Sequence, residues 1–566
     1  MMRVHVKGQG EVTLSKQDYV AQGGEGTIYI KGSTAYKLYT DPSKMIPPGK
    51  ISELGRLTDP NIIKPERVIT DKRGNPLGYT MRAVPNTMAL CSLFPRVFRD
   101  RHGITPDMVT KLVAKLRDGV QNVHDAGCLI VDLNEMNFLM SEQFDDLFFI
   151  DVDSYQTPHF PATALMQSVR DWTVQNNQWT TGSDWYSFGV VSFQMFVGIH
   201  PFKGKHPGGI KGFEDRMKAN LSVLDSSVRV PKVVLPFDVI PPSYLEWYKA
   251  IFQDGKRMPP PTDMKGGTLI LVPTIKVLQG TDNLDIAELY EYEGTIKGFA
   301  ESHGTVFAWT TEGVWVGNRK VFNAAQGVAT VGFTPTKNRA IAAGVSVSQG
   351  RLRLFDVADR KEVQITCNAD RVMGYDNRIY VHNGSKILEV ILRDVGKQVV
   401  ASTQIVCNVM PRATKLYDGC AIQALLGATY VAVFPSSGVS HQVHIKELDD
   451  YQIVDAKYDN NVLMVVGSKN GQYDRIICRF DDRYSAYDFR LVEDITPTGL
   501  NFVVLDSGVC ICMTEDEKLE LFSNRKGSKG IKVVDDPTLS GDMRLMKRPA
   551  GVVFPRGSKI YSMKMK

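Results

Sequence analysis

The chain has 566 residues, whereas a single hydrophobic core rarely serves more than roughly 250–300, so we expect two or three domains. Hydrophobic residues make up 43% and charged residues 23% of the sequence, ordinary proportions that exclude extensive disorder or a fibrous repeat. The formal net charge of +5 comes without a dense stripe of Lys or Arg, so nucleic acid is not expected as a partner.

The N-terminal half predicts a small sheet followed by a helical body. Residues 12–39 and 62–84 alternate apolar and polar side chains between Gly and Pro, which is typical of short strands. Apolar residues then recur at helical spacing in 106–126 and again in 185–197. This half is therefore expected to belong to the α+β class.

A Pro-rich run at 258–263, followed by a turn at 265–267, cannot continue a helix and marks a domain boundary. Residues 263–566 then show short β-rich runs between Gly, Asn and Asp turns, which predicts an all-β domain. Comparable apolar runs begin at residues 306, 340, 379, 430, 463, 509 and 552, near the ~40–50-residue period of propeller repeats. We expect a seven-bladed β-propeller, and a pair of β-sandwiches would give a similar pattern.

The cysteines and the apolar runs bear on redox state and location. The 8 cysteines lack the spacings of metal sites or disulfide scaffolds, so we expect them to be reduced and buried. Cys510 and Cys512 stand on the same face of a predicted strand, which leaves a redox role open for this pair. No apolar run has signal length or reaches the ~18 residues of a membrane span. The expectation is a cytoplasmic protein without a membrane partner.

Glycines cluster near the N-terminus, where Gly23, Gly24 and Gly26 lie in a predicted strand-turn-strand. Since Gly has no Cβ, the main-chain N–H groups of such a loop can lie over the phosphates of a nucleotide. A hairpin turn without a ligand would use the same residues.

Lys37 lies in the apolar strand 35–38, nine residues after Ile28. An unpaired ammonium is costly to bury, so this side chain needs an anionic partner. The alternative is an edge strand that leaves the ammonium in water. The short interval from Ile28 to Lys37 requires a tight hairpin.

The most specific motif runs from His124 to Leu139, where a helix ends at Gly127 and Asp132 and Asn137 follow with the spacing D-L-x-x-x-N. This is the spacing of the protein-kinase catalytic loop, and the N-terminal half resembles divergent bacterial and phage Ser/Thr kinases. The resemblance implies that Asp132 orients the substrate hydroxyl and accepts its proton, while Asn137 ligates Mg²⁺. The His-Arg that normally precedes the aspartate is Ile130-Val131, so activation-loop phosphorylation is not expected to be the switch.

The same resemblance assigns the remaining ligands. Asp151 follows an apolar strand in the place of the Asp of D-F-G and is expected to bind Mg²⁺, with Asp153 as a second metal ligand. Glu53 stands for the helix glutamate that pairs with the lysine, although its spacing is slightly short. The alternatives without a ligand are an exposed acidic turn for Asp151 and Asp153 and a surface glutamate for Glu53. The ATP-binding set is then Gly23, Gly24, Gly26, Ile28, Lys37 and Glu53, with Lys37 also counted as catalytic.

Two further segments resemble structural parts of a kinase. Asp184 opens the helix that begins near residue 183, like the buried aspartate that braces the catalytic loop. Arg257 resembles the arginine that fixes the activation segment, but its usual A-P-E partner cannot be found in the sequence.

These observations predict a multidomain chain with a kinase N-lobe at 1–85, a C-lobe at 86–262 and a β-propeller-like domain at 263–566. The expected function is transfer of the γ-phosphoryl group of ATP, with Mg²⁺, to Ser or Thr hydroxyls, while the propeller recruits a protein substrate or partner. A pseudokinase scaffold that binds nucleotide without transfer is the alternative from another class. A small-molecule acceptor or nucleotidyl transfer also stays open.

Overall fold

The computed structural model describes residues 2–23, 25–210, 212–264, 281, 283–323, 327–346, 348–497, 499–549 and 551–566. The chain divides into two compact units. The first comprises Met1–Pro273 with the short segments Gly467–Asp474 and Glu493–Gly499; the second comprises Thr274–Val466, Arg475–Val492 and Leu500–Lys566. Gly24 and the turn expected at 265–267 lie outside the described residues, so the boundary between 262 and 263 stays a prediction.

The first unit opens with a 7-stranded antiparallel sheet in the order β2-β1-β6-β7-β5-β4-β3. Alternate residues of these strands, among them Val4, Leu38 and Ile69, are buried on one face and form its core. Lys31 pairs with Thr34, which confirms the tight hairpin expected between β4 and β5. The strands are β1 (Met2–Val6), β2 (Gly10–Leu14), β3 (Tyr19–Gln22), β4 (Gly26–Lys31), β5 (Thr34–Tyr39), β6 (Arg67–Thr70) and β7 (Pro76–Arg82).

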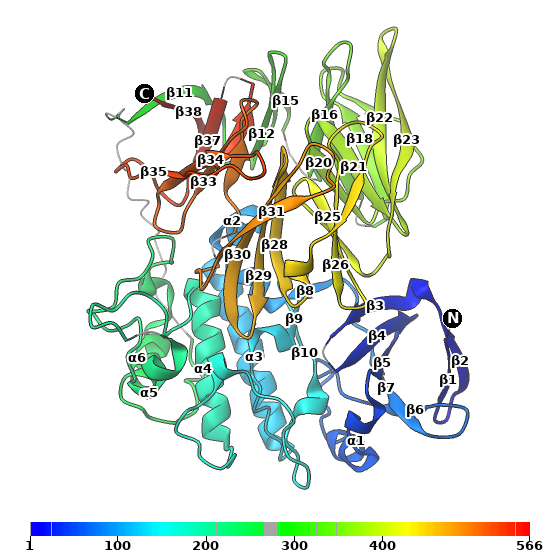
Figure 1. The fold of residues 1–566 in the computed structure, drawn as a ribbon, viewed down its shortest axis with the longest axis vertical. Helices are drawn as coiled ribbons and strands as arrows, with labels where there is room; N and C mark the ends of the chain where they lie inside the picture. The colour runs from blue at the N-terminus through cyan, green and yellow to red at the C-terminus, as the bar shows by residue number, and fades with distance from the viewer. Residues whose placement is uncertain are drawn as a thin grey trace. The chain divides into compact units, whose positions relative to one another are not determined.

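After this sheet, residues 83–264 of the first unit form helices and a small sheet (Figure 1), and helix α1 lies between β5 and β6. The helices are α1 (Pro48–Leu54), α2 (Arg96–His102), α3 (Pro106–Asp125), α4 (Thr181–Val197), α5 (Phe213–Lys218) and α6 (Pro242–Phe252). The small sheet has the order β10-β9-β8, with β8 (Thr87–Ala89), β9 (Phe138–Ser141) and β10 (Leu147–Phe149). Single 3₁₀ turns are η1 (Lys16–Asp18), η2 (Pro42–Lys44), η3 (Leu90–Leu93), η4 (Glu135–Asn137), η5 (Val152–Ser154), η6 (Gln167–Val169) and η7 (Phe237–Val239), with η8 (Lys446–Leu448) in the second unit.

The two helices predicted at 106–126 and 185–197 are confirmed as α3 and α4. α3 begins where the Thr105 hydroxyl accepts a hydrogen bond from the Met108 N–H, a normal N-cap. α4 is buried along its length from Ser183 to Val197, as expected for a helix with apolar residues on every side. It packs against α3, beside which Figure 1 draws it, and against α6.

From Leu284 on, the described chain is built from 7 four-stranded antiparallel sheets, and the segment Gly467–Asp474 of the first unit belongs to one of them. The strands of the first four are β12 (Ile296–Ser302), β13 (Thr305–Thr310), β14 (Gly313–Val316) and β15 (Arg319–Phe322); β16 (Thr330–Phe333), β17 (Ala340–Ser346), β18 (Arg351–Asp356) and β19 (Lys361–Val363); β20 (Arg371–Tyr375), β21 (Arg378–Asn383), β22 (Lys386–Val395) and β23 (Gln398–Asn408); and β24 (Thr414–Tyr417), β25 (Cys420–Leu425), β26 (Ala428–Val433) and β27 (His441–His444).

The remaining three sheets complete the chain. They are β28 (Gln452–Asp459), β29 (Val462–Lys469), β30 (Gln472–Phe480) and β31 (Tyr487–Val492); β32 (Phe502–Val504), β33 (Val509–Met513), β34 (Leu519–Ser523) and β35 (Lys532–Val534); and β36 (Met546–Arg548), β37 (Gly551–Arg556), β38 (Lys559–Met565) with β11 (Leu284–Glu291). In the last sheet β11 pairs with β38, so the first strand of this half is hydrogen-bonded to the last. The all-β prediction for this half is confirmed.

The apolar runs that suggested repeats are distributed one to a sheet. They lie in β13, β17, β21, β26, β29, β33 and β37, each of which belongs to a different four-stranded sheet. Each run is largely buried, because it provides the side chains that pack against neighbouring strands. The sequence period therefore reports a repeated structural unit.

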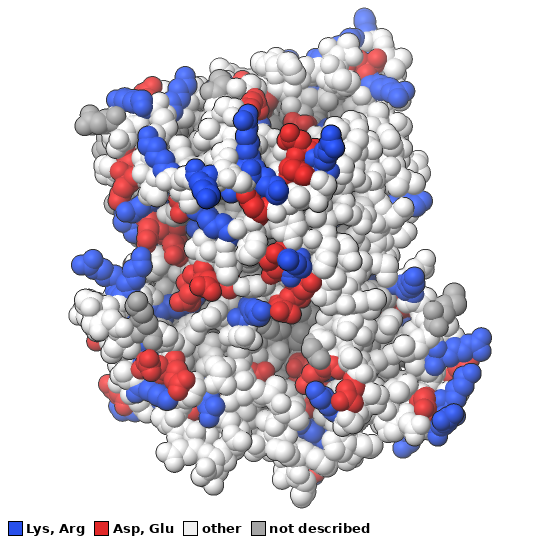
Figure 2. Space-filling model, in the orientation of Figure 1, with Lys and Arg blue, Asp and Glu red and all other residues white. Residues whose placement is uncertain are grey.

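All 8 cysteines are buried and free, as expected from their scattered spacing. Burial raises the pKa of both the Cys510 and the Cys512 thiol, which disfavours the reactive thiolate. Among the described residues no helix has the length and apolarity needed to cross a bilayer. On the face drawn in Figure 2, Lys and Arg side chains alternate with Asp and Glu.

Candidate active site

Lys37 is the centre of the best-defined polar cluster in the first unit. On β5 it pairs with Ile28 of β4 and with Tyr79 of β7, so it sits in the middle of the sheet and not at an edge. Gly78 permits this close pairing, since a Cβ there would lie 1.9 Å from the Lys37 carbonyl oxygen. The side chain of Lys37 is 8% exposed. The edge-strand alternative, with the ammonium in water, is therefore wrong.

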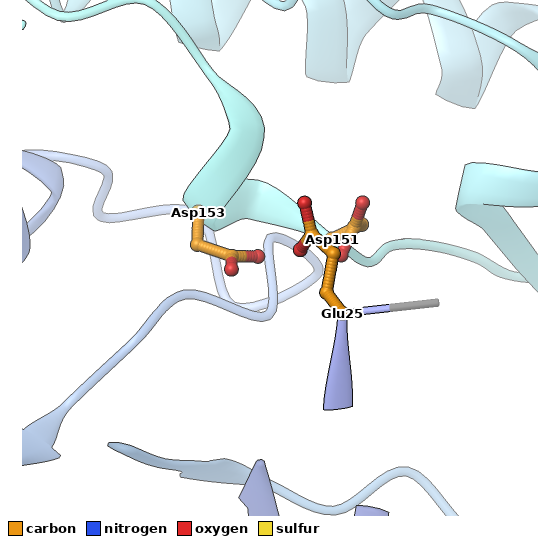
Figure 3. Close-up of side chains that lie close together, drawn as sticks. All are labelled: Glu25, Asp151 and Asp153. Carbon is orange, nitrogen blue, oxygen red and sulfur yellow. The ribbon is translucent and has the colours of Figure 1, made fainter. Parts of the chain in front are cut away.

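Three carboxylates surround the Lys37 ammonium. Its Nζ lies 2.7 Å from Asp153 Oδ2, 3.0 Å from Asp151 Oδ1 and 3.2 Å from Glu25 Oε2. Figure 3 shows the three carboxylates converging, Glu25 from the glycine-rich loop and the two aspartates from the segment after β10. Although burial alone would lower it, Asp153 and Asp151 raise the pKa of Lys37 above its ordinary value. The lysine is therefore a cation at neutral pH.

Asp151 and Asp153 are presented by one turn. Asp151 has φ of 59°, a left-handed conformation that reverses the chain directly after β10 and starts the 3₁₀ turn η5. The Ser154 N–H and hydroxyl both donate to the Asp151 carbonyl oxygen, at 3.1 and 2.8 Å, which closes the turn. The side chain of Asp151 stays 36% exposed, whereas that of Asp153 is 3% exposed. Two neighbouring carboxylates thus occupy different environments.

These environments shift the pKa values of the two acids in opposite directions. Burial raises the pKa of Asp151, despite the nearby Lys37 ammonium. For Asp153 burial acts in the same direction, but Lys37 and the hydroxyls of Tyr39 and Tyr79 outweigh it and lower the pKa. The Tyr39 hydroxyl donates to Asp153 Oδ2 at 2.6 Å, the atom that also contacts Lys37. The lowered pKa favours the charged form of Asp153, and the raised pKa makes Asp151 the easier of the two to protonate.

The glycine-rich loop is anchored beside this cluster. The Gly23 N–H donates to the Gly26 carbonyl at 2.9 Å, and the Thr40 N–H donates to the Glu25 carbonyl at 2.9 Å. A Cβ at Gly26 would lie 2.4 Å from the Leu38 carbonyl oxygen, so this glycine is required for strand contact, whereas open space surrounds Gly23. The loop holds the Glu25 backbone in place and leaves its side chain half exposed over Lys37.

Asp132 and Asn137 form a second cluster, linked to the first through the backbone. The Asn137 Nδ2 donates to the Asp132 carbonyl at 3.0 Å and to its Oδ2 at 3.4 Å, and the Met166 N–H donates to Asp132 Oδ1 at 2.7 Å. The Ile150 N–H donates to the Asn137 carbonyl at 2.9 Å. Since Ile150 directly precedes Asp151, this bond fixes the catalytic-loop residues relative to η5.

Asp184 holds the backbone that leads into Asp132. Its side chain is fully buried and accepts hydrogen bonds from the Ile130 N–H at 2.8 Å and the Val131 N–H at 2.9 Å, while His124 Nε2 lies 2.9 Å away. Val131 has φ of 64°, a left-handed conformation that a β-branched residue adopts only under constraint. The expected contact of Asp184 with the backbone that leads into Asp132 is confirmed.

One predicted contact differs from expectation, and one partner that the sequence did not reveal is found. Glu53 lies on α1, but its carboxylate contacts His159, whose Nδ1 is 2.6 Å from Glu53 Oε1. The structure does not bring it to Lys37, because α1 has only 7 residues and faces the segment after η5. Arg257, whose partner the sequence did not reveal, donates to both carboxylate oxygens of Asp171, at 2.6 and 2.7 Å.

Glu135 was not singled out in the sequence, although it stands between Asp132 and Asn137. It is 1% exposed, and burial raises its pKa. Its Oε1 accepts a hydrogen bond at 2.7 Å from the hydroxyl of Tyr473, which belongs to the segment Gly467–Asp474 of the same compact unit. No local pattern signals a contact between residues 338 positions apart.

Comparison with known proteins adds little beyond this geometry. No protein-family model and no curated protein matches the sequence. Among solved structures the chain is similar to the Cydia pomonella granulovirus kinase PK-1, at 14% identity over 44% of this chain and 92% of that chain, with a TM-score of 0.33. A TM-score of this size carries no argument about function, so the function has to be inferred from the side chains of the site.

Proposed function

We propose that the chain is a protein kinase that uses ATP and Mg²⁺ and transfers the γ-phosphoryl group to Ser or Thr hydroxyls. The observation that carries the proposal is the ion pair between Lys37 and Asp151, whose charged atoms lie 3.0 Å apart although the residues are 114 positions apart. Both were selected from the sequence by their kinase spacing. A buried strand lysine and an acid after a β-hairpin have no local reason to meet, so their contact supports the shared site.

The donor atoms suit the cofactor. Carboxylate and amide oxygens are the ligands that Mg²⁺ prefers, and one carboxylate oxygen each from Glu25, Asp151 and Asp153 lie within 4.8 Å of one another. Because Asn137 uses its Nδ2 to contact Asp132, its Oδ1 is the atom that can ligate a cation. Asp151 and Asn137 are the proposed ligands, and bound Mg²⁺ would neutralise phosphate charge.

The chain's own residues have distinct tasks in this proposal. Lys37 binds phosphate oxygens through a permanently charged ammonium, and the open backbone at Gly23 allows close approach of the phosphates. Asp132 accepts the proton of the acceptor hydroxyl, with its carboxylate oriented by the N–H donors of Met166 and Asn137. Orientation and charge placement are the main contributions that phosphoryl transfer requires of a protein.

One observation favours the scaffold alternative. Glu53 contacts His159 in place of Lys37, so the usual lysine–glutamate pair of an active kinase is missing at this helix. A pseudokinase would keep nucleotide binding at Lys37 and lose transfer.

For the C-terminal half we propose a seven-bladed β-propeller that recruits a protein substrate or partner. The support is the set of 7 four-stranded antiparallel sheets and the pairing of β11 with β38, which would close a ring of blades. A pair of β-sandwiches would instead distribute these strands over four sheets, each with more than four strands.

Radiolabel transfer tests the proposed function. We expect ³²P from γ-labelled ATP to reach a Ser/Thr substrate or the chain itself with Mg²⁺ and wild-type protein, and transfer to fall at least 100-fold in Asp132→Asn and Asp151→Asn. The matched control is Asp107→Asn, which removes an exposed carboxylate on α3 in a simple i,i+4 ion pair. ATP binding with no transfer above the Asp132→Asn level would support the scaffold instead. Label arriving only from α-labelled ATP would replace the proposal by nucleotidyl transfer.

A further inference from the structure

A catalytic lysine needs a fixed carboxylate partner. The lysine ammonium ends a flexible four-carbon stem, so its position is set only if a neighbouring acid holds it. Glu53, the helix residue expected to do this, is engaged with His159 at 2.6 Å. The three acids that do reach Lys37 differ in distance, in exposure and in their other contacts, and these differences identify the one that holds it.

Asp153 has the contact of a permanent partner. Its Oδ2 lies 2.7 Å from Lys37 Nζ, its side chain is 3% exposed, and the Tyr39 hydroxyl donates to the same oxygen. Asp151 and Glu25 are farther from the ammonium and keep 36% and 48% of their side chains exposed. A buried pair is held firmly because either charge alone would be uncompensated, whereas exposed pairs exchange with water at little cost.

Two tyrosines on β5 and β7 also contact this pair. Tyr39 lies two residues from Lys37 on β5 and therefore on the same face of the sheet. Tyr79 lies on the neighbouring strand β7 and pairs directly with Lys37. The Lys37 ammonium is 5.4 Å from the Tyr39 ring and 5.8 Å from the Tyr79 ring, distances at which aromatic faces attract a cation. Both tyrosines are buried. The Lys37 ammonium is therefore held by the two tyrosine rings of the sheet and by Asp153 of the turn η5.

We propose that Asp153 is the positioning residue for Lys37, in place of a helix glutamate, and that it is not a metal ligand. Asp153 Oδ2 already serves Lys37 and Tyr39, and Asp153 Oδ1, which accepts no hydrogen bond of normal geometry among the described residues, is buried away from solvent. Asp151, two residues earlier in the chain, keeps 36% of its side chain exposed and is the carboxylate that can leave the ammonium for a cation. The inference rests on the proposed function, because it assigns roles within the same ATP site.

The test separates lysine positioning from metal binding. For Asp153→Asn we expect the KM for ATP to rise, and kcat/KM to fall about 10- to 100-fold, the usual loss on removing a residue that orients a ligand-binding group. The Mg²⁺ concentration for half-maximal rate should stay within about twofold of wild type. Asp151→Asn should instead raise that Mg²⁺ concentration about tenfold or more. Glu53→Gln should affect the KM for ATP much less than Asp153→Asn.

Two further variants guard against a folding defect. Tyr39→Phe removes one donor to Asp153 without changing charge and should give a smaller rise in KM in the same direction. Asp153→Glu keeps the carboxylate and should recover part of the loss if the protein melts as wild type does. A Mg²⁺ shift in Asp153→Asn equal to that of Asp151→Asn would make Asp153 a metal ligand and overturn the inference. So would an equal loss in Glu53→Gln.

Equilibrium ATP binding by calorimetry keeps the two proposals distinguishable. If wild type binds ATP with Mg²⁺ but transfers no phosphate, the proposed function fails, and the same variant comparison on the Kd decides the role of Asp153. Weaker ATP binding in Asp153→Asn with unchanged Mg²⁺ dependence supports the inference in that case. If wild type binds no ATP at all, both proposals are wrong.

Discussion

Replacing Asp184 by Asn tests whether the catalytic loop is held in a strained shape by one buried carboxylate. Asp184 accepts hydrogen bonds from the Ile130 and Val131 N–H groups, one on each oxygen. Asn offers a single oxygen, so its amide nitrogen would face one of these donors. Losing one charge-assisted bond and leaving a buried N–H unpaired costs about 3–5 kcal/mol.

Part of this cost is recovered by relaxation of the loop. Val131 is held at φ of 64°, and strain of this kind amounts to about 1–3 kcal/mol per residue. If the loop relaxes, the free energy of unfolding falls by only about 0–4 kcal/mol, less than the 5–15 kcal/mol typical of a folded domain. The displaced Asp132 carboxylate then loses its alignment, and a shift of about 1 Å reduces a rate about 10²-fold. The rate per folded molecule should therefore fall about 10²-fold in addition to the loss of stability.

The assay combines urea unfolding, phosphoryl transfer and hydrogen exchange at the Ile130 and Val131 amides, which should exchange faster in Asp184→Asn. The matched control is Ser192→Ala on the same helix, which loses a buried hydrogen bond of 2.8 Å to Tyr248 far along α4. The control should lose about 1–3 kcal/mol of stability and retain its rate per folded molecule. A rate loss in Asp184→Asn that merely follows the folded fraction would refute the positioning role.

Three further predictions concern other supports of the site. Arg257→Lys replaces a fork that contacts both oxygens of Asp171 by a single ammonium, so the urea midpoint should fall by the equivalent of about 1–3 kcal/mol; an unchanged midpoint would contradict this. Gly26→Ala places a Cβ 2.4 Å from a β5 carbonyl oxygen and should both destabilise by about 1–3 kcal/mol and weaken ATP binding, whereas Gly23→Ala, with open space, should spare stability. Burial lowers the pKa of His200 to about 3, whereas the unfolded chain has a pKa near 6.5. The free energy of unfolding should therefore be highest above pH 6.5 and fall by about 1.4 kcal/mol per pH unit below it, a loss of about 2 kcal/mol at pH 5. This slope should disappear in His200→Gln, as measured by the pH dependence of unfolding.

Local patterns in the sequence were sufficient for α3, α4 and the β-rich half, and for part of the site. Helix α3 has both an N-cap and regular apolar spacing, and the β-rich runs recur because each supplies the buried strand of one sheet. Lys37 and Asp151 could be selected as a pair because each stands at a fixed offset from a motif, the glycine-rich loop and the D-L-x-x-x-N loop. Spacing within a motif is a local property, so one sequence can reveal it.

The partners of those residues could not be predicted in the same way. Asp171 meets Arg257 across 86 positions, and Tyr39 meets Asp153 across 114, with no motif that links either pair. Glu53 was selected by its spacing along the chain, which is slightly short, and its carboxylate contacts His159. Such contacts depend on how strands and turns pack, which periodicity does not report.

The position of Asp153 explains how a first unit with so short an α1 can still hold Lys37. In a kinase whose lysine depends on a helix glutamate, movement of that helix makes or breaks the pair. Here the buried partner comes from η5, the turn that also carries Asp151, and that turn is tied through Ile150 to Asn137 of the catalytic loop. Lys37, Asp151 and the loop from Asp132 to Asn137 are therefore connected without α1. Ile130 and Val131 stand in place of the usual His-Arg pair. Under the proposed function, neither movement of α1 nor phosphorylation of an activation loop is expected to switch this site.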